Sequence, residues 1–296
     1  MPAALDYSIV DVFTREALAG NPLAVVIDSV GLATDRMQSI AREFNLSETT
    51  FVQRRSTSIE HDEGIRVRIF TTQEELPFAG HPTLGTASVL RTLAPEAVSD
   101  MTIALALNVG RVPVRFEDSA GTFGEMTQRN PEFGPLLDSA TVTHLLGLES
   151  GDLDPSLAPQ VVSTGTAFAI VALRSLDSLA RLNVKQQEAT VWLRERGARW
   201  FYVVAPTGVQ EPAFRARMQF NGGEDPATGS AAGCAISYLV ANGAVASSRR
   251  ILLRQGVEMG RPSDLYLHAE RDGPQVSQVC VGGSTVLVAT GQLFLS

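Results

Sequence analysis

The sequence predicts an α+β protein built from two similar domains. Its 296 residues exceed the roughly 100–150 of a typical domain. Hydrophobic residues make up 44% and charged residues 19%, a balance that favours packed cores over disorder. Strand-like runs followed by a Pro/Gly loop and a helix rich in Gly and Ala occur in both halves of the chain. These observations favour two pseudo-symmetric domains.

The first half begins with short β-prone runs. A Gly-Asn-Pro turn at 20–22 separates the first two runs and predicts a hairpin-like pair. Apolar residues at helical spacing predict a helix over 35–44, capped by Thr34 or Asp35 and ended by Asn45. The first-half strands are expected at 7–13, 23–27, 49–53, 65–70, 101–107, 111–116 and 124–128.

A loop over 75–82 breaks the strand pattern and leads into small and apolar residues at 83–90. Pro82 fits the first turn of a helix there. In the second half, a similar loop at 223–231 leads into a helix over 232–240. The other second-half helices are expected at 176–182 and 186–196, and the strands at 161–163, 169–172, 200–205, 215–220, 251–254, 264–268, 276–280 and 285–289.

The two loop-helix segments form an internal repeat in which Phe78–Ala87 corresponds loosely to Pro226–Ala235. Two such units predict a ligand site in a cleft between domains. The free N–H groups and dipole at the two helix N-termini favour an anion. An acidic protein could therefore hold an acidic substrate. Alternatively, the small residues serve only helix packing.

Composition excludes several other functions. The net charge of −8 and pI of about 5.1 disfavour nucleic acid as a partner. No apolar run reaches the roughly 18 residues of a membrane span, and the first residues lack the features of a signal peptide, so a cytoplasmic protein is expected. The histidines show no metal-ligand spacing, so no metal site is predicted. Cys234 and Cys280 lack CxxC partners and are expected to be buried thiols.

Four residues could carry acid/base or nucleophilic chemistry. Glu48 lies between a helix end and an apolar strand, where desolvation would raise its pKa and suit it to proton transfer. His81 and Asp225 lie in the two repeat loops and could join it in one cluster. Ser230 could be a nucleophile, but its surroundings do not match GxSxG. Each of these residues could instead be an ordinary surface, turn or cap residue.

Five blocks of motif residues are spread over nearly the whole chain. They are Asp11-Val12-Phe13 with Gly20–Val26, Asn45–Val52, Arg68–Thr72 with Glu75–Gly85, Glu224–Ala231, and Gln255-Gly256 with Met259–Ser263. In content and order, these blocks resemble the phenazine-biosynthesis PhzF-like family. Thr71-Thr72-Gln73-Glu74 departs from the pattern, because relatives often have a proline after the threonine.

The resemblance implies a diaminopimelate epimerase-like fold, in which each domain is a curled mixed sheet around a central helix. The last strand of the family returns to the first domain. The expected domains are therefore 1–128 with 284–296, and 129–283. The resemblance also implies a homodimer.

The resemblance further implies an isomerase that needs no cofactor and moves a proton on a small anionic metabolite, as in isomerisation of a dihydro-hydroxyanthranilate. Glu48 would be the acid/base, and His81 and Asp225 would assist. Related epimerases use two cysteines as bases, but Ala79 and Ala227 stand near those positions here. The implied substrate-binding residues are Gly80, Gly229, Ser230 and Ala231.

Two other functions stay open from the sequence. One is a non-catalytic small-acid-binding protein that keeps the cleft. The other is a hydrolase that uses Ser230 and His81.

Overall fold

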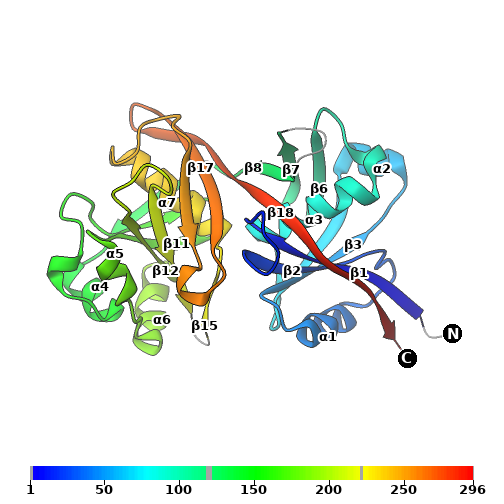
Figure 1. The fold of residues 1–296 in the computed structure, drawn as a ribbon, viewed down its shortest axis with the longest axis horizontal. Coiled ribbons are helices and arrows are strands. Elements are labelled where there is room, and N and C mark those ends of the chain that lie inside the picture. The colour runs from blue at the N-terminus through cyan, green and yellow to red at the C-terminus, as the bar shows by residue number, and fades with distance from the viewer. Residues whose placement is uncertain (1–2, 118–121, 221–222, 296) are drawn as a thin grey trace. The chain divides into compact units, whose positions relative to one another are not determined.

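The computed structural model describes residues 3–117, 122–220 and 223–295 (Figure 1). The chain divides into unit 1, which comprises Met1–Met126 and Gly282–Ser296, and unit 2, which comprises Thr127–Val281. Each unit is a mixed β-sheet that packs around one buried helix. The predicted α+β fold class is confirmed.

The sheet of unit 1 closes around its central helix. Its strands follow the order β1-β2-β3-β4-β6-β7-β8, and β18 is hydrogen-bonded to both β8 and β1. The pairs β2–β3 and β4–β6 are parallel, and β5 adds to β4. The strands are β1 (Ala3–Val12), β2 (Asn21–Val26), β3 (Glu48–Gln53), β4 (Ile65–Phe70), β5 (Glu75–Leu76), β6 (Thr102–Leu107), β7 (Gly110–Phe116), β8 (Phe123–Thr127) and β18 (Gln275–Leu295). The part of β18 from Gly282 onward belongs to unit 1, and the part before it belongs to unit 2.

The central helix of unit 1 is α3 (Gly80–Leu93), and every residue from Gly80 to Ala87 is buried. A helix enclosed on all sides has no polar face, which explains its run of small and apolar residues. A Cβ on Gly85 would lie 2.7 Å from side-chain atoms of both Leu23 and Val12, so a glycine permits this close packing. Pro82 lies in the first turn, as predicted.

Unit 2 repeats this architecture with the order β17-β16-β13-β12-β11-β10-β9. Its central helix is α7 (Gly229–Ala241), which is buried from Ala231 to Val240. The pairs β11–β12 and β13–β16 are parallel. The strands are β9 (Glu132–Leu136), β10 (Gln160–Ser163), β11 (Ala167–Ala172), β12 (Trp200–Pro206), β13 (Phe214–Arg217), β16 (Ile251–Gln255) and β17 (Ser263–Asp272), with a small hairpin of β14 (Gln219–Phe220) and β15 (Gly223–Glu224).

Amphipathic helices pack on the sheets of both units. In unit 1, Met37, Ile40 and Ala41 of one such helix pack with Val26, Phe51 and Phe70. None of the helices in the described ranges has the length and apolar character needed to span a membrane. These helices are α1 (Thr34–Phe44) and α2 (Thr57–Glu63) in unit 1, and α4 (Ser139–Leu146), α5 (Leu176–Ala180) and α6 (Gln186–Glu195) in unit 2.

Some local predictions were wrong. The N-cap of α1 is Ala33, without a side-chain cap bond, whereas Asn45 ends the helix in the left-handed conformation as predicted. The two strands predicted over 276–289 are one continuous strand, β18. Position 282 within this strand is a glycine, and a Cβ there would lie 2.9 Å from the Gly124 carbonyl oxygen. A glycine therefore permits the close approach of the two backbones.

The structure also shifts the internal repeat by one residue. Glu75 and Glu224 precede the helix starts at Gly80 and Gly229 by the same number of residues. Arg68 and Arg217 pair with these glutamates across the same spacing. The helix starts therefore align Gly80 with Gly229, whereas the letter comparison that paired Phe78 with Pro226 aligned Gly80 with Thr228.

Candidate functional site

Glu48 is the first residue of β3, just after α1. The left-handed turn at Asn45 ends the helix and brings the chain directly into the strand. Because β2 and β3 are parallel, the strand starts at Asn21 and Glu48 lie at the same edge of the sheet. The Glu48 side chain is only 16% exposed, so the carboxyl group is largely withdrawn from water.

His81, the second residue of α3, faces Glu48. Its Nε2 lies 3.5 Å from Glu48 Oε2, and its side chain is 5% exposed. Its Nδ1 lies 3.3 Å from the Asn21 side-chain nitrogen.

Burial decides the protonation state of this histidine. It lowers the pKa of His81 to about 3, and a backbone hydrogen bond with Pro22 opposes this shift only in part. The ring is therefore neutral at neutral pH, and its contact with Glu48 joins a carboxyl group to a neutral imidazole. Such a pair can pass a proton or hydrogen-bond a substrate without a buried positive charge.

In unit 2, Asp225 follows β15 and begins the turn that leads into α7. Its N–H donates to the Met218 carbonyl oxygen at 3.0 Å. The Thr228 hydroxyl donates to Asp225 Oδ2 at 2.7 Å, so the carboxylate has a fixed direction. The predicted residues Gly229, Ser230 and Ala231 then form the first turn of α7.

The first turns of α3 and α7 share two properties. Neither N-cap residue, Ala79 or Thr228, makes a side-chain cap bond, and neither first turn contains an acidic residue. The helix dipole at these ends favours a negative ligand group. The predicted binding residues Gly80 and Gly229 are the first residues of the two helices.

Cys234 is unsuited to act as a base. It is buried inside α7, and this burial raises the pKa of its thiol to about 11. At neutral pH the group is a thiol rather than the thiolate that proton abstraction would need. Cys280 is also buried.

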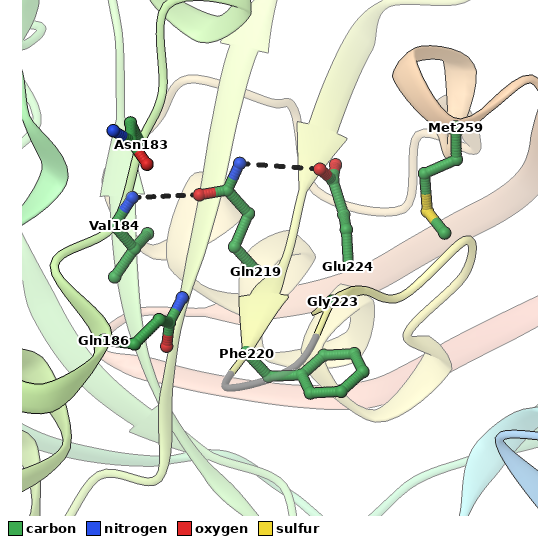
Figure 2. A pocket seen from close by; sticks show the side chains of 8 residues that line it. All are labelled: Asn183, Val184, Gln186, Gln219, Phe220, Gly223, Glu224 and Met259. Atoms are coloured by element: carbon green, nitrogen blue, oxygen red, sulfur yellow. Dashed lines mark hydrogen bonds between the residues drawn. The ribbon is translucent and has the colours of Figure 1, made fainter.

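Unit 2 has a cavity of about 550 Å³ whose lining includes none of the predicted site residues, although Glu224 of the lining precedes Asp225 in the chain (Figure 2). It is lined in part by Gln219, Phe220 and Glu224. Gln219 accepts from the Val184 N–H at 2.9 Å, and Glu224 pairs with Arg217. These two polar side chains are therefore held by bonds within unit 2, and the other polar lining residues are Asn183 and Gln186.

Comparison with known proteins identifies the family. The sequence model of the phenazine biosynthesis-like proteins matches residues 10–291. The chain belongs to this family. The predicted family is confirmed.

The relatives of the chain indicate its class of activity. It is 37% identical to an uncharacterized isomerase of Mesorhizobium japonicum and 35% identical to the trans-2,3-dihydro-3-hydroxyanthranilate isomerase of Pseudomonas aeruginosa. Both comparisons cover 98% of this chain and 99% of the relative. The crystal structure of a Bacillus anthracis PhzF-family protein matches with a TM-score of 0.87 and 25% identity, covering 99% of this chain and 100% of that one. The chain is an isomerase, as predicted.

Two contact residues of the site had no predicted role. Asn21 belongs to the predicted turn and to one of the family blocks, and it contacts His81. Gln255 contacts Asp225 and Thr228, although 30 and 27 residues separate them in the chain. Its membership of the block Gln255-Gly256 was the sequence signal for Gln255.

Proposed function

We propose that this protein is a cofactor-independent isomerase that transfers a proton between carbons of a small, cyclic carboxylic acid. The observation that carries the proposal is the contact between Glu48 and His81, in which a largely buried carboxyl group lies 3.5 Å from a neutral imidazole. The name of the Pseudomonas aeruginosa relative supports a substrate similar to trans-2,3-dihydro-3-hydroxyanthranilate.

In the proposed reaction, the Glu48 carboxylate removes a proton from one carbon and becomes a carboxylic acid. It then returns a proton to a second carbon, and the double bond shifts between them. No atom or electron is gained or lost overall, so the chemistry requires no redox cofactor. His81 would assist by hydrogen-bonding to the substrate beside Glu48.

We propose that Asp225 and Ser230 contribute polar groups that bind the substrate. The first-turn backbone N–H groups of Gly80, Gly229 and Ala231 would favour its carboxylate. This set is supported by the uncapped first turns of α3 and α7 and by the fixed direction of the Asp225 carboxylate. A homodimer that acts in the cytoplasm is part of the same proposal.

The decisive experiment replaces Glu48 by Gln and measures deuterium incorporation from heavy water into trans-2,3-dihydro-3-hydroxyanthranilate and related cyclic acids. We expect the rate to fall by about 10²- to 10⁴-fold, the usual effect of losing a general acid/base. Glu43→Gln is the matched control, because Glu43 is exposed on α1. Undiminished exchange in Glu48→Gln would contradict the assignment.

A binding measurement and a labelling experiment on the wild type separate the two alternative functions. A non-catalytic binder would bind these acids without exchanging any hydrogen in the wild type. A hydrolase would be labelled at Ser230 by a phosphonylating probe. Either result would replace the proposed isomerisation.

A further inference from the structure

We propose that Gln255, a fully buried amide at the end of β16, is a positioning residue that fixes Asp225 and the start of α7 for the reaction. This inference rests on the proposed function, because it concerns how one of its substrate-binding residues is held. Gln255 has no exposed surface. Burying an amide is unfavourable unless its polar atoms are bonded, so its contacts show what holds it there.

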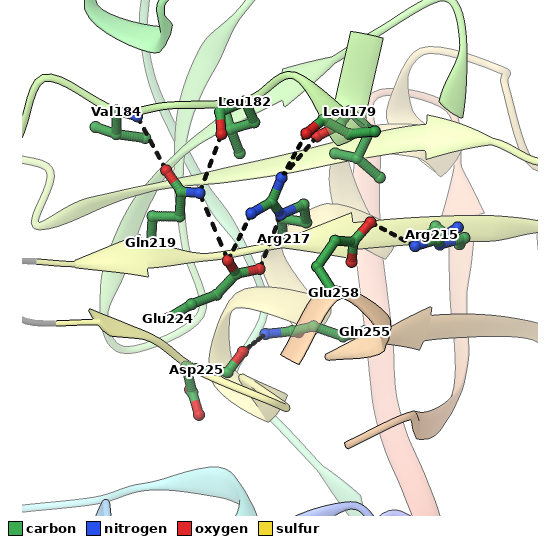
Figure 3. A network of polar contacts seen from close by, with 11 residues as sticks. Leu179, Leu182, Val184, Arg215, Arg217, Gln219, Glu224, Asp225, Gln255 and Glu258 are labelled. Carbon is green, nitrogen blue, oxygen red and sulfur yellow. Dashed lines mark hydrogen bonds and ion pairs between the residues drawn. The ribbon is translucent and has the colours of Figure 1, made fainter. Parts of the chain in front are cut away.

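The Gln255 side chain uses both of its polar atoms. Its Nε2 donates to the Asp225 carbonyl oxygen at 2.7 Å and to Thr228 Oγ1 at 3.0 Å. Its Oε1 accepts from the Thr228 N–H at 3.1 Å and from the Tyr202 hydroxyl at 2.8 Å. Figure 3 shows the first of these bonds reaching from β16 to the Asp225 backbone. Three of these four bonds therefore hold the turn between Asp225 and Thr228.

These bonds also determine the direction of the Thr228 hydroxyl. The Gln255 amide nitrogen can only donate, so Thr228 Oγ1 accepts from it. The single hydroxyl proton of Thr228 then points to Asp225 Oδ2, 2.7 Å away. A chain of hydrogen bonds thus runs from Gln255 through Thr228 to the Asp225 carboxylate and orients it.

Unit 1 lacks both members of this arrangement. Leu76 follows Glu75 there, whereas Asp225 follows Glu224 in unit 2. The residue of β6 at the same distance from the strand start as Gln255 in β16 is Ala106. The acidic residue and the amide that holds it thus occur together in unit 2, and apolar residues occupy both equivalent positions in unit 1. This pairing favours a role for Gln255 that depends on Asp225.

The test compares Gln255→Glu and Thr228→Val with the wild type by steady-state proton exchange in heavy water. Gln255→Glu keeps an acceptor for Tyr202 but loses both Nε2 donors, and Thr228→Val removes the hydroxyl that faces Asp225. A displacement on the order of 1 Å can lower a rate by about 10²-fold, so we expect each variant to lose 10- to 100-fold in kcat. Gln160→Glu is the control, because the Gln160 amide donates instead to the Gly134 carbonyl oxygen.

A positioning role also predicts non-additivity with Asp225→Asn. If Gln255 acts through Asp225, adding Gln255→Glu to Asp225→Asn lowers kcat little further. Losses that multiply, or folded variants with wild-type kcat, would overturn the inference. If the wild type is active and Glu48→Gln is inactive, such results defeat this inference alone. A wild type without any exchange would defeat the proposed function and this inference together.

Discussion

Both units place an Arg–Glu ion pair before the central helix, and the spacing along the chain is the same in each. The pair is Arg68–Glu75 before α3 in unit 1 and Arg217–Glu224 before α7 in unit 2. Both helices are buried and start without a side-chain cap bond. Their second residues differ, because α3 carries His81 and α7 carries Ser230. The residue after the paired glutamate differs too, since it is Leu76 in unit 1 and Asp225 in unit 2. A repeated scaffold thus carries an imidazole beside a carboxyl group in unit 1 and an oriented carboxylate in unit 2.

The ion pairs give the largest expected difference between the units. Arg217 and Glu224 side chains are 9% and 12% exposed, against 16% and 23% for Arg68 and Glu75. Arg217 also donates to the Leu179 carbonyl oxygen at 3.1 Å (Figure 3). Arg217→Met leaves the buried Glu224 carboxylate with the Gln219 amide as a donor at the longer distance of 3.5 Å, so we expect a loss of about 3–5 kcal/mol in the free energy of unfolding. Urea denaturation followed by circular dichroism measures this loss.

Arg68→Met should cost less, since Glu75 is more exposed and keeps the Asn108 amide as a donor at 2.9 Å. Adding Glu224→Gln to Arg217→Met removes the unpaired charge and should restore much of the stability. Equal losses in the two single variants would contradict the proposed difference between the pairs.

The next difference lies in the second residue of each central helix, which is His81 in α3 and Ser230 in α7. It concerns how folding stability depends on pH. Unfolding restores the pKa of His81 from about 3 to its ordinary value of 6.5. Between these two values the unfolded chain binds a proton that the folded protein does not, so folding stability falls as the pH is lowered. The fall should approach about 1.4 kcal/mol per pH unit, or about 2 kcal/mol between pH 6.5 and 5.

His81→Asn should lose this part of the pH dependence, whereas Ser230→Ala should keep it. Urea denaturation at a series of pH values between 4.5 and 8 measures the slope. A wild-type slope that His81→Asn leaves unchanged would show that the imidazole does not resist protonation in the folded state.

The sequence contained enough information to predict the scaffold. The small and apolar residues at 83–90 and 232–240 predicted the helices observed as α3 and α7, and the family resemblance implied that a sheet encloses each of them. The alternation in Ile65–Phe70 predicted β4 with its observed bounds. Both predictions depend on periodicity and composition over neighbouring residues, which one segment contains by itself.

The contacts of the site depend on residues far apart in the chain. His81 is neutral because the surrounding sheet buries it, and Gln255 matters because folding brings it to Asp225. The repeat was aligned one residue off because Ala-Gly and Ala-Thr-Gly sequences resemble each other as letters, whereas the helix starts fix the register. The roles of Glu48, His81, Asp225 and Ser230 stay predictions that the proposed experiments test.

The smallest expected difference concerns a glycine inside each central helix. A Cβ on Gly233 of α7 would lie 1.9 Å from Gln128 Oε1, whereas a Cβ on Gly85 of α3 would meet the apolar side chains of Leu23 and Val12 at 2.7 Å. Gln128 donates to the Gly229 carbonyl oxygen at 2.9 Å and accepts from the Thr164 hydroxyl at 2.7 Å. Moving it would therefore break hydrogen bonds in addition to crowding the core.

Both Gly→Ala variants should lose about 1–3 kcal/mol from overpacking. Gly233→Ala should lose about 1 kcal/mol more than Gly85→Ala, the net value of a typical hydrogen bond. Urea midpoints of the two variants measure the difference. Shortening the amide in Gly233→Ala/Gln128→Ala should remove the clash, so that Gly233→Ala destabilises this background less than the wild type. A larger loss of unfolding free energy in Gly85→Ala than in Gly233→Ala would contradict this prediction. It would show that the apolar packing around Gly85 contributes more to stability than the Gln128 hydrogen bonds beside Gly233.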